Sequence, residues 1–125
     1  MNYPLRKWVL FFKRKYYAIA YPKFKYILKK KSYNLNHTIL DIGCGGNSPF
    51  LTKIIFPHSK YTGIDRDFSY HNNQLSQDLI DVKIEFDLNK NIRFLKEKLG
   101  DTKYDIIIIN HTIEHTFYGL DILKI

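Results

Sequence analysis

The segment from Ile39 to Asn47, ILDIGCGGN, constrains the fold of this chain more than any other feature. A short apolar strand over Thr38 to Ile42 carries a single acid, Asp41, and leads directly into a turn. The turn contains three glycines, Gly43, Gly45 and Gly46. Glycine is needed where the backbone adopts a positive φ or lies directly against a ligand. This pattern therefore predicts a tight, ligand-facing turn at the end of a strand.

A helix start follows the turn. Ser48 is predicted as the N-cap and Pro49 as the first helical residue. A strand, a glycine turn and a helix N-terminus in this order favour a nucleotide-binding site on a parallel sheet. A dinucleotide fingerprint would require a third glycine where Ser48 stands, and no Gly-Lys-Ser/Thr of a P-loop follows.

Three further strands are predicted downstream. The second, Tyr61 to Asp65, ends on an acid; the third, Val82 to Phe86, is followed by Asp87 and Leu88. The fourth, Tyr104 to Asn110, is a continuous apolar run of the kind that is buried on both faces of a parallel sheet.

Helical segments are predicted between these strands, over Pro49 to Phe56, within Phe68 to Ile80, and over Ile92 to Leu99. Alternating strands and helices imply right-handed crossovers. We therefore expect an α/β, Rossmann-like, doubly wound and mainly parallel sheet of about four strands, preceded by a basic helical N-terminal arm.

The glycine turn resembles the first motif of class I S-adenosylmethionine-dependent methyltransferases, an acid-x-Gly-x-Gly pattern that here starts at Asp41. Many members have a third glycine where this chain has Asn47. Asp65, Asp87 and the segment HTIEH (His111 to His115) also match the family's strand-end positions in order.

The resemblance implies a role for each matching residue. Backbone groups of the glycine turn would approach the methionine part of S-adenosylmethionine, and Asp41 would orient its ammonium group. Asp65 would accept hydrogen bonds from the ribose hydroxyls, Asp87 from the adenine amino group, and the Leu88 N–H would contact the ring. The implied cofactor-binding residues are Asp41, Gly43, Cys44, Gly45, Gly46, Asp65, Arg66, Asp87, Leu88 and Asn110.

Each assignment has a structural alternative. The glycines could form an ordinary strand–helix turn, and Asp41 could only stabilise that turn by hydrogen bonding. Asp65 could be a solvated strand-end acid, and Asp87 could open a turn before the third helix.

His111 and His115 are the candidate catalytic residues, because a histidine at the mouth of the site could act as a general base toward a hydroxyl or amine acceptor. The order H-x-x-E-H also occurs in inverted zinc proteases, which need a further downstream ligand. The position directly after a parallel strand favours the methyltransferase layout, and no metal is expected.

Cys44 is the single cysteine, so no internal disulfide can form and a reducing, cytoplasmic location is expected. With no basic partner evident, Cys44 is interpreted as a small side chain in a crowded turn and not as a nucleophile. No apolar stretch approaches the ~18 residues of a membrane span.

The positive charge is concentrated at the N-terminus. Residues 1–40 hold ten Lys and Arg and no acid, against a charge of −2 for the remainder. The arm could pack on the sheet with its aromatic residues inward, which is the favoured interpretation. It could also bind nucleic acid, or lie on an anionic membrane surface.

Two regions are expected, the arm over 1–37 and an incomplete cofactor-binding domain over 38–125. Class I methyltransferases have about seven strands, so the chain is expected to be truncated relative to that family. The predicted function is methyl transfer from S-adenosylmethionine to an acceptor that the sequence does not indicate. The alternative is an inactive remnant or binding module that retains part of the cofactor site.

Overall fold

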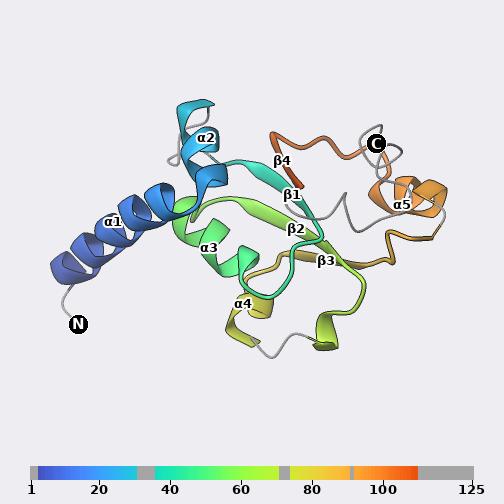
Figure 1. The fold of residues 1–125 in the computed structure, drawn as a ribbon, viewed down its shortest axis with the longest axis horizontal. Coiled ribbons are helices and arrows are strands. Elements are labelled where there is room, and N and C mark those ends of the chain that lie inside the picture. Colours follow the sequence, from blue (N-terminus) through green and yellow to red (C-terminus); the bar gives the residue numbers. More distant parts are fainter. Residues whose placement is uncertain (1–2, 31–35, 71–73, 91, 110–125) are drawn as a thin grey trace.

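A computed structural model describes residues 3–30, 36–70, 74–90 and 92–109. Two helices, α1 (Tyr3–Ala20) and α2 (Pro22–Lys30), precede the first strand. The remaining elements alternate between strand and helix, as Figure 1 shows. In chain order they are β1 (Thr38–Ile42), α3 (Ser48–Ile55), β2 (Lys60–Asp65), the 3-10 turn η1 (Phe68–Tyr70), α4 (Gln74–Asp78), β3 (Val82–Glu85), α5 (Ile92–Leu99) and β4 (Ile106–Ile109).

The four strands form one sheet in the order β3-β2-β1-β4, and every neighbouring pair is parallel. Asp41 of β1 is paired with Gly63 of β2, and Asp65 at the end of β2 is paired with Glu85 of β3. This order confirms the predicted doubly wound α/β fold, because the chain moves outward from β1 to β3 and returns to place β4 on the other side of β1. The carboxyl ends of all four strands therefore meet at one edge of the sheet.

The predicted strand boundaries agree with the structure to within two residues. The fourth strand starts at Ile106 and not at Tyr104. Asp105 precedes the ladder, and its carboxylate accepts hydrogen bonds from the Thr38 N–H (2.9 Å) and hydroxyl (3.0 Å). Asp105 thus ties the start of β4 to the start of β1.

Helices cover both faces of the sheet. On the face that carries α3, apolar side chains of the strands pack against α2, α3 and the segment after α4. This α3-side core includes Phe24, Ile39, Cys44, Leu51, Ile55, Phe56, Tyr61, Phe68, Ile80, Ile106 and Ile108. The α5-side core, on the opposite face, consists of Leu40, Ile42, Ile64, Phe86, Leu88, Leu95 and Leu99.

The two N-terminal helices differ in how they contact this body. Phe24 of α2 is completely buried in the α3-side core, so α2 belongs to the helical layer of the sheet. α1 contacts α2 and α3 and extends away from the sheet (Figure 1). The inward packing expected for the arm holds at Phe24, whereas Phe12 and Tyr16 of α1 are exposed. Within the described ranges, no helix is long and apolar enough to cross a membrane.

Candidate functional site

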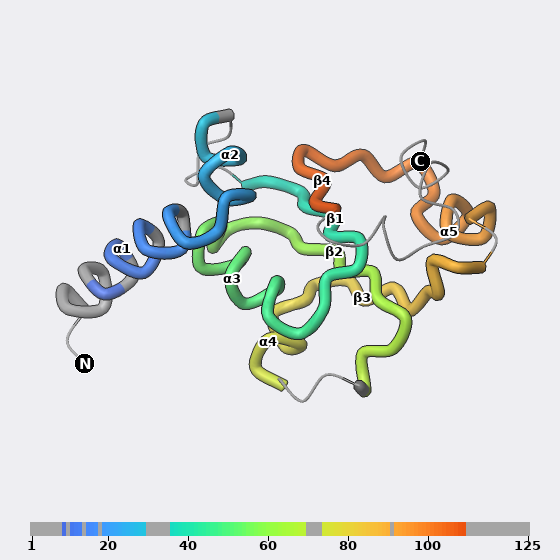
Figure 2. Tube along the Cα trace, viewed as in Figure 1, coloured from blue at the N-terminus to red at the C-terminus, as the bar shows by residue number. Residues whose placement is uncertain are grey.

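The glycine turn joins β1 to α3 at the carboxyl edge of the sheet, and its path is clear in Figure 2. Gly43 has φ of 73° and Gly45 has φ of 63°. An L side chain in this left-handed region costs roughly 1–2 kcal/mol, which explains glycine at both positions. Gly46 does not have a positive φ, so backbone conformation does not require a glycine there.

Asp65 lies beside this turn. Its Oδ2 accepts a hydrogen bond from the Gly45 N–H over 3.1 Å, and its Oδ1 accepts one from the Arg66 N–H over 2.7 Å. A Cβ placed on Gly45 would have no atom within 4 Å, so the turn is open on that side. The structure thus places the strand-end acid and an open backbone turn side by side.

Asp87 follows the neighbouring strand β3. The Phe86 N–H donates to the Asp65 carbonyl (2.9 Å), which brings the two strand ends together. The Asp87 carboxylate accepts the Asn89 N–H (2.9 Å), and its carbonyl accepts the Lys90 N–H (2.8 Å). Asp87 therefore opens a turn, while the Leu88 side chain is buried in the α5-side core and anchors the backbone of this segment.

Asp41 is buried beneath the glycine turn, with 2% of its surface exposed. Its Oδ2 accepts hydrogen bonds from the Ser48 hydroxyl and the Tyr61 hydroxyl, each over 2.5 Å. Burial raises the pKa of the Asp41 carboxyl, although both hydroxyls and the nearby Lys23 charge act in the opposite direction. The carboxylate thereby joins β1 to β2 and to the first turn of α3.

Lys23 extends this network into the N-terminal region. Its Nζ donates to the Ser48 Oγ over 2.9 Å, so α2 is linked to the residue that follows the glycine turn. Burial lowers the pKa of the Lys23 ammonium, while attraction to Asp41 raises it.

Sequence reasoning missed Tyr61 and Lys23. Tyr61 carried a usable signal, because a tyrosine at the start of a buried strand needs a partner for its hydroxyl. Lys23 carried none, since it stands among other lysines of a basic helix.

The prediction that Ser48 caps α3 is wrong. Asn47 occupies the cap position with helical backbone angles (φ −103°, ψ −23°) and forms no side-chain cap bond, and Ser48 is the first helical residue. The physical reason is the buried acid: a polar group in the core needs hydrogen-bond partners, and Asp41 takes the Ser48 hydroxyl as one of them.

Cys44 points into the α3-side core and is 4% exposed. A Cβ on Gly63 would lie 3.1 Å from its Sγ, so the thiol occupies the space that this glycine leaves. Burial, followed by the charges of Asp41 and Asp65, raises the pKa of the thiol. The side chain packs and is held as a neutral thiol, in agreement with its interpretation as a small group in a crowded turn.

Asn110, His111 and His115 lie outside the described residues, and so do the rest of the HTIEH segment and the alternative metal ligands.

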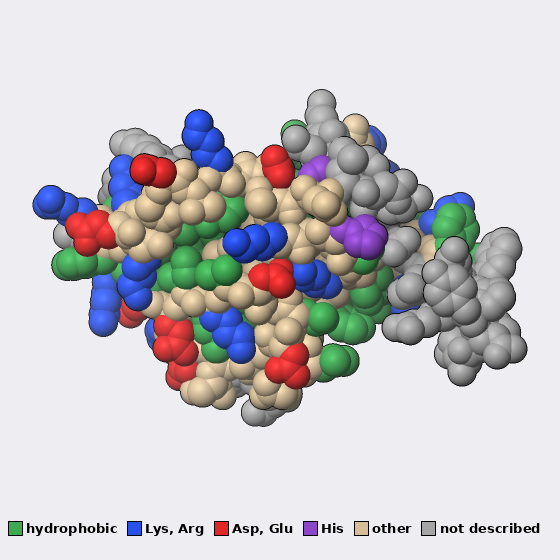
Figure 3. Space-filling view, turned by 180° about the vertical axis from the view of Figure 1, so that it is seen from behind, with side chains coloured by type: hydrophobic (Ala, Val, Ile, Leu, Met, Phe, Trp, Pro, Cys, Tyr) green, Lys and Arg blue, Asp and Glu red, His purple; other side chains and the backbone are tan. Residues whose placement is uncertain are grey.

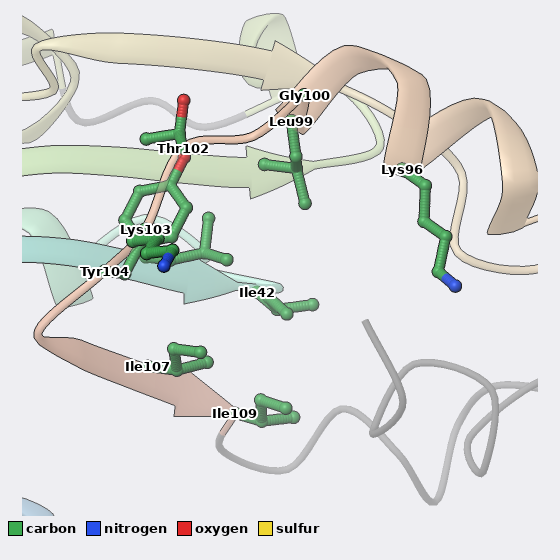
Figure 4. A pocket seen from close by; sticks show the side chains of 10 residues that line it. Ile42, Lys96, Leu99, Gly100, Thr102, Lys103, Tyr104, Ile107 and Ile109 are labelled. Atoms are coloured by element: carbon green, nitrogen blue, oxygen red, sulfur yellow. The ribbon is translucent and has the colours of Figure 1, made fainter.

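A cavity of about 740 Å³ opens on the α5 face of the sheet. Figure 4 shows Ile42 of β1 and Ile107 and Ile109 of β4 along it, with Leu99 from α5. Among the described residues that line it, none belongs to the glycine turn or to the strand-end acids, so this cavity is distinct from the candidate cofactor site.

The strand order and the glycine turn at the carboxyl edge define the fold class. The chain has a class I methyltransferase-like, Rossmann-type α/β fold. It is similar to a solved structure described as MycE methyltransferase from the mycinamycin biosynthetic pathway in complex with Mg, SAH and mycinamycin VI. The TM-score is 0.56 at 23% sequence identity, over 86% of this chain and 30% of that chain. No protein-family model and no curated protein matches the sequence.

Proposed function

We propose that the carboxyl edge of the sheet binds S-adenosylmethionine and that the chain acts as a methyltransferase, which transfers the methyl group to an unidentified acceptor. The observation that carries this proposal is the placement of the Asp65 carboxylate 3.1 Å from the N–H of Gly45 in an open glycine turn. The likeness to the MycE methyltransferase structure, which contains SAH, supports it at the level of the fold.

The described residues fit such a cofactor. Nothing lies within 4 Å of the position that a Cβ would take on Gly45, so the methionine part can approach this backbone closely. An ionised carboxylate only accepts hydrogen bonds, and Asp65 therefore suits a pair of ribose hydroxyls. Asp87 and the Leu88 N–H, at the neighbouring strand end, would hold the adenine ring.

When bound, S-adenosylmethionine supplies a methyl group already activated on a positively charged sulfur. The chain then has to align the acceptor and exclude water, so no strong nucleophile is required. Lys23, Ser48 and Tyr61 would hold Asp41 and the turn above it in position, through the hydrogen bonds that join α2, α3 and β2. His111 and His115 are proposed as general-base candidates on the strength of the sequence alone.

Calorimetric titration of the full chain with S-adenosylhomocysteine tests this function. We expect saturable binding that Asp65→Ala weakens about 10- to 100-fold, because hydrogen bonds to a charged group contribute about 1.5–3 kcal/mol each. Asp65→Asn keeps an acceptor for the Gly45 N–H, so the hydrogen bond to the turn should be retained while affinity falls through the lost charge.

Asp101→Ala is the matched control, since Asp101 is an exposed acid in the turn between α5 and β4, at the opposite edge of the sheet. Equal affinity in the wild-type chain and the Asp65 variants, or no heat from a folded wild-type chain, would refute the proposal.

A further inference from the structure

Helix α1 exposes a continuous row of apolar side chains. Val9, Phe12, Tyr16 and Ile19 have exposed fractions of 36%, 62%, 66% and 80%. Their spacing of three, four and three residues places them on one face of the helix, over about three turns. We call these four residues the α1 stripe.

The opposite side of α1 faces the folded body. Tyr17 packs against the α3-side core, and α1 contacts α2 and α3. The α1 stripe therefore points away from the core, on a helix that extends beyond the sheet (Figure 1). Contiguous apolar surface of this kind marks an interaction site more often than isolated exposed residues do.

The charge around the stripe is entirely positive. α1 contains five Lys and Arg and α2 contains four, and neither helix has an acid. Lys13 and Lys15 are exposed, and their positions place them on the two sides of the α1 stripe. Residues 41–125 hold ten Lys and Arg and twelve Asp and Glu, and on the face that Figure 3 shows, basic and acidic side chains lie among one another. The excess of positive charge is thus specific to the N-terminal helices, one of which carries the α1 stripe.

We propose that α1 docks on an anionic lipid surface, with the α1 stripe at the boundary between headgroups and acyl chains. Lys13 and Lys15 would then lie at the level of the lipid phosphates. A helix with an apolar face and a basic polar face binds in this way, parallel to the membrane plane.

Lipid accounts for these residues better than nucleic acid does. Val9 and Ile19 are aliphatic, and they have no aromatic face on which a base could stack. Contact with a phosphate backbone would leave both in water, whereas the lipid boundary removes them from it.

The chain carries its own reporter of this contact, because its single tryptophan, Trp8, belongs to α1. The full chain is mixed with neutral phosphatidylcholine vesicles or with vesicles containing phosphatidylserine. Sedimentation with the vesicles and tryptophan emission are then measured together. We expect binding to the anionic vesicles, a shift of the emission to shorter wavelength, and loss of binding as salt is raised.

Substitutions separate the contribution of the apolar stripe to vesicle binding from that of the neighbouring lysines. Phe12→Ser should weaken vesicle binding about tenfold, because it removes a large apolar group from the boundary. The control is Phe94→Ser on α5, where the phenylalanine is similarly exposed (58%). Lys13→Gln and Lys15→Gln should each weaken binding by a factor on the order of five, and only to the anionic vesicles. The altered side chains are exposed, so circular dichroism should show unchanged folding.

Three results would overturn the proposal. One is absence of vesicle binding by the folded chain, or binding that Phe12→Ser leaves unchanged. Another is binding to a single-stranded oligonucleotide without vesicle binding, which would assign the surface to nucleic acid. The third is self-association in sedimentation velocity that Phe12→Ser abolishes while vesicles do not bind, which would assign the stripe to a second copy of the chain.

Discussion

The carboxylate of Asp65 accepts a hydrogen bond from the N–H of Gly45, which lies twenty residues earlier in the chain, in the turn that follows the neighbouring strand β1. This bond ties the strand-end acid to the glycine turn. A ligand with hydroxyl groups and a polar chain would therefore meet an acceptor and an open backbone already placed together.

Substitutions at Gly45 and Gly100 separate the effect of a strained backbone on stability from its effect on ligand binding. Both have a positive φ (63° and 58°), and a Cβ on either would meet no atom within 4 Å. Gly45→Ala and Gly100→Ala should each lower the free energy of unfolding by about 1–2 kcal/mol, measured by urea denaturation. Only Gly45→Ala should also weaken S-adenosylhomocysteine binding; equal affinities in the two variants would place the ligand elsewhere.

Lys23 links α2 to the turn that follows β1, and Lys23→Met removes this link while keeping an apolar stem. We expect a loss of about 1 kcal/mol in the free energy of unfolding, because the ammonium donates to Ser48 within a partly buried network. Lys25→Met on the same helix is the control, since Lys25 is exposed. Urea denaturation that gives the same small change for both variants would show that the contact contributes nothing.

The buried Asp41 predicts a pH dependence of stability. Burial raises the pKa of Asp41 above its ordinary value of 3.8, so the folded chain binds this proton more readily than the unfolded chain. The associated stability is present below about pH 3.8 and is lost as the pH rises through the folded pKa. Relative to Asp41→Asn, the wild-type chain should thus lose stability as the pH rises above about 4. If the difference in unfolding free energy between the wild-type chain and Asp41→Asn did not change with pH, the raised pKa of Asp41 would be contradicted.

Asp81 should make stability depend on pH in the direction opposite to that of Asp41. Burial alone would raise the pKa of Asp81, but hydrogen bonds from the Lys53 ammonium and the Tyr61 N–H hold it below 3.8. Its contribution is present above that value and disappears as the pH falls through the folded pKa. Urea denaturation of Asp81→Asn should accordingly show the wild-type advantage shrinking below about pH 4, in the reverse direction to Asp41.

Gly63 and Cys44 should be energetically coupled. A Cβ on Gly63 would lie 3.1 Å from the Cys44 Sγ and 3.3 Å from Cε1 of Tyr61. Gly63→Ala should therefore lower the free energy of unfolding by about 1–3 kcal/mol. In a Cys44→Ala background the loss should shrink by roughly 1 kcal/mol, because the sulfur is no longer there. Strictly additive effects in this double-mutant cycle would argue against the contact.

The sequence predicted the strands and the sheet well, because their signals are local. Thr38 to Ile42 is an apolar segment that ends at glycines, and the isoleucines from Ile106 are apolar without interruption. The helix over Ile92 to Leu99 was also predicted with its observed bounds, since apolar spacing and Gly100 mark both its face and its end.

Long-range contacts were beyond the same reasoning. Ser48 has the sequence position of a cap, yet its hydroxyl goes to Asp41, whose burial depends on how β1 and α3 pack. Lys23 reaches the same network from another helix, twenty-five residues away. The exposure of Phe12 likewise depends on which face of α1 meets the body, and spacing alone favoured the inward orientation.

Amide-resolved NMR of the full ¹⁵N-labelled chain, titrated with S-adenosylhomocysteine, tests the central claim most directly. The account predicts saturable shifts at the amides of Gly43 to Gly46, Asp65 and Leu88, the groups at the carboxyl edge of the sheet. Shifts confined to Leu40, Ile107 and their neighbours in the α5-face cavity, or no shifts in a folded chain, would contradict it.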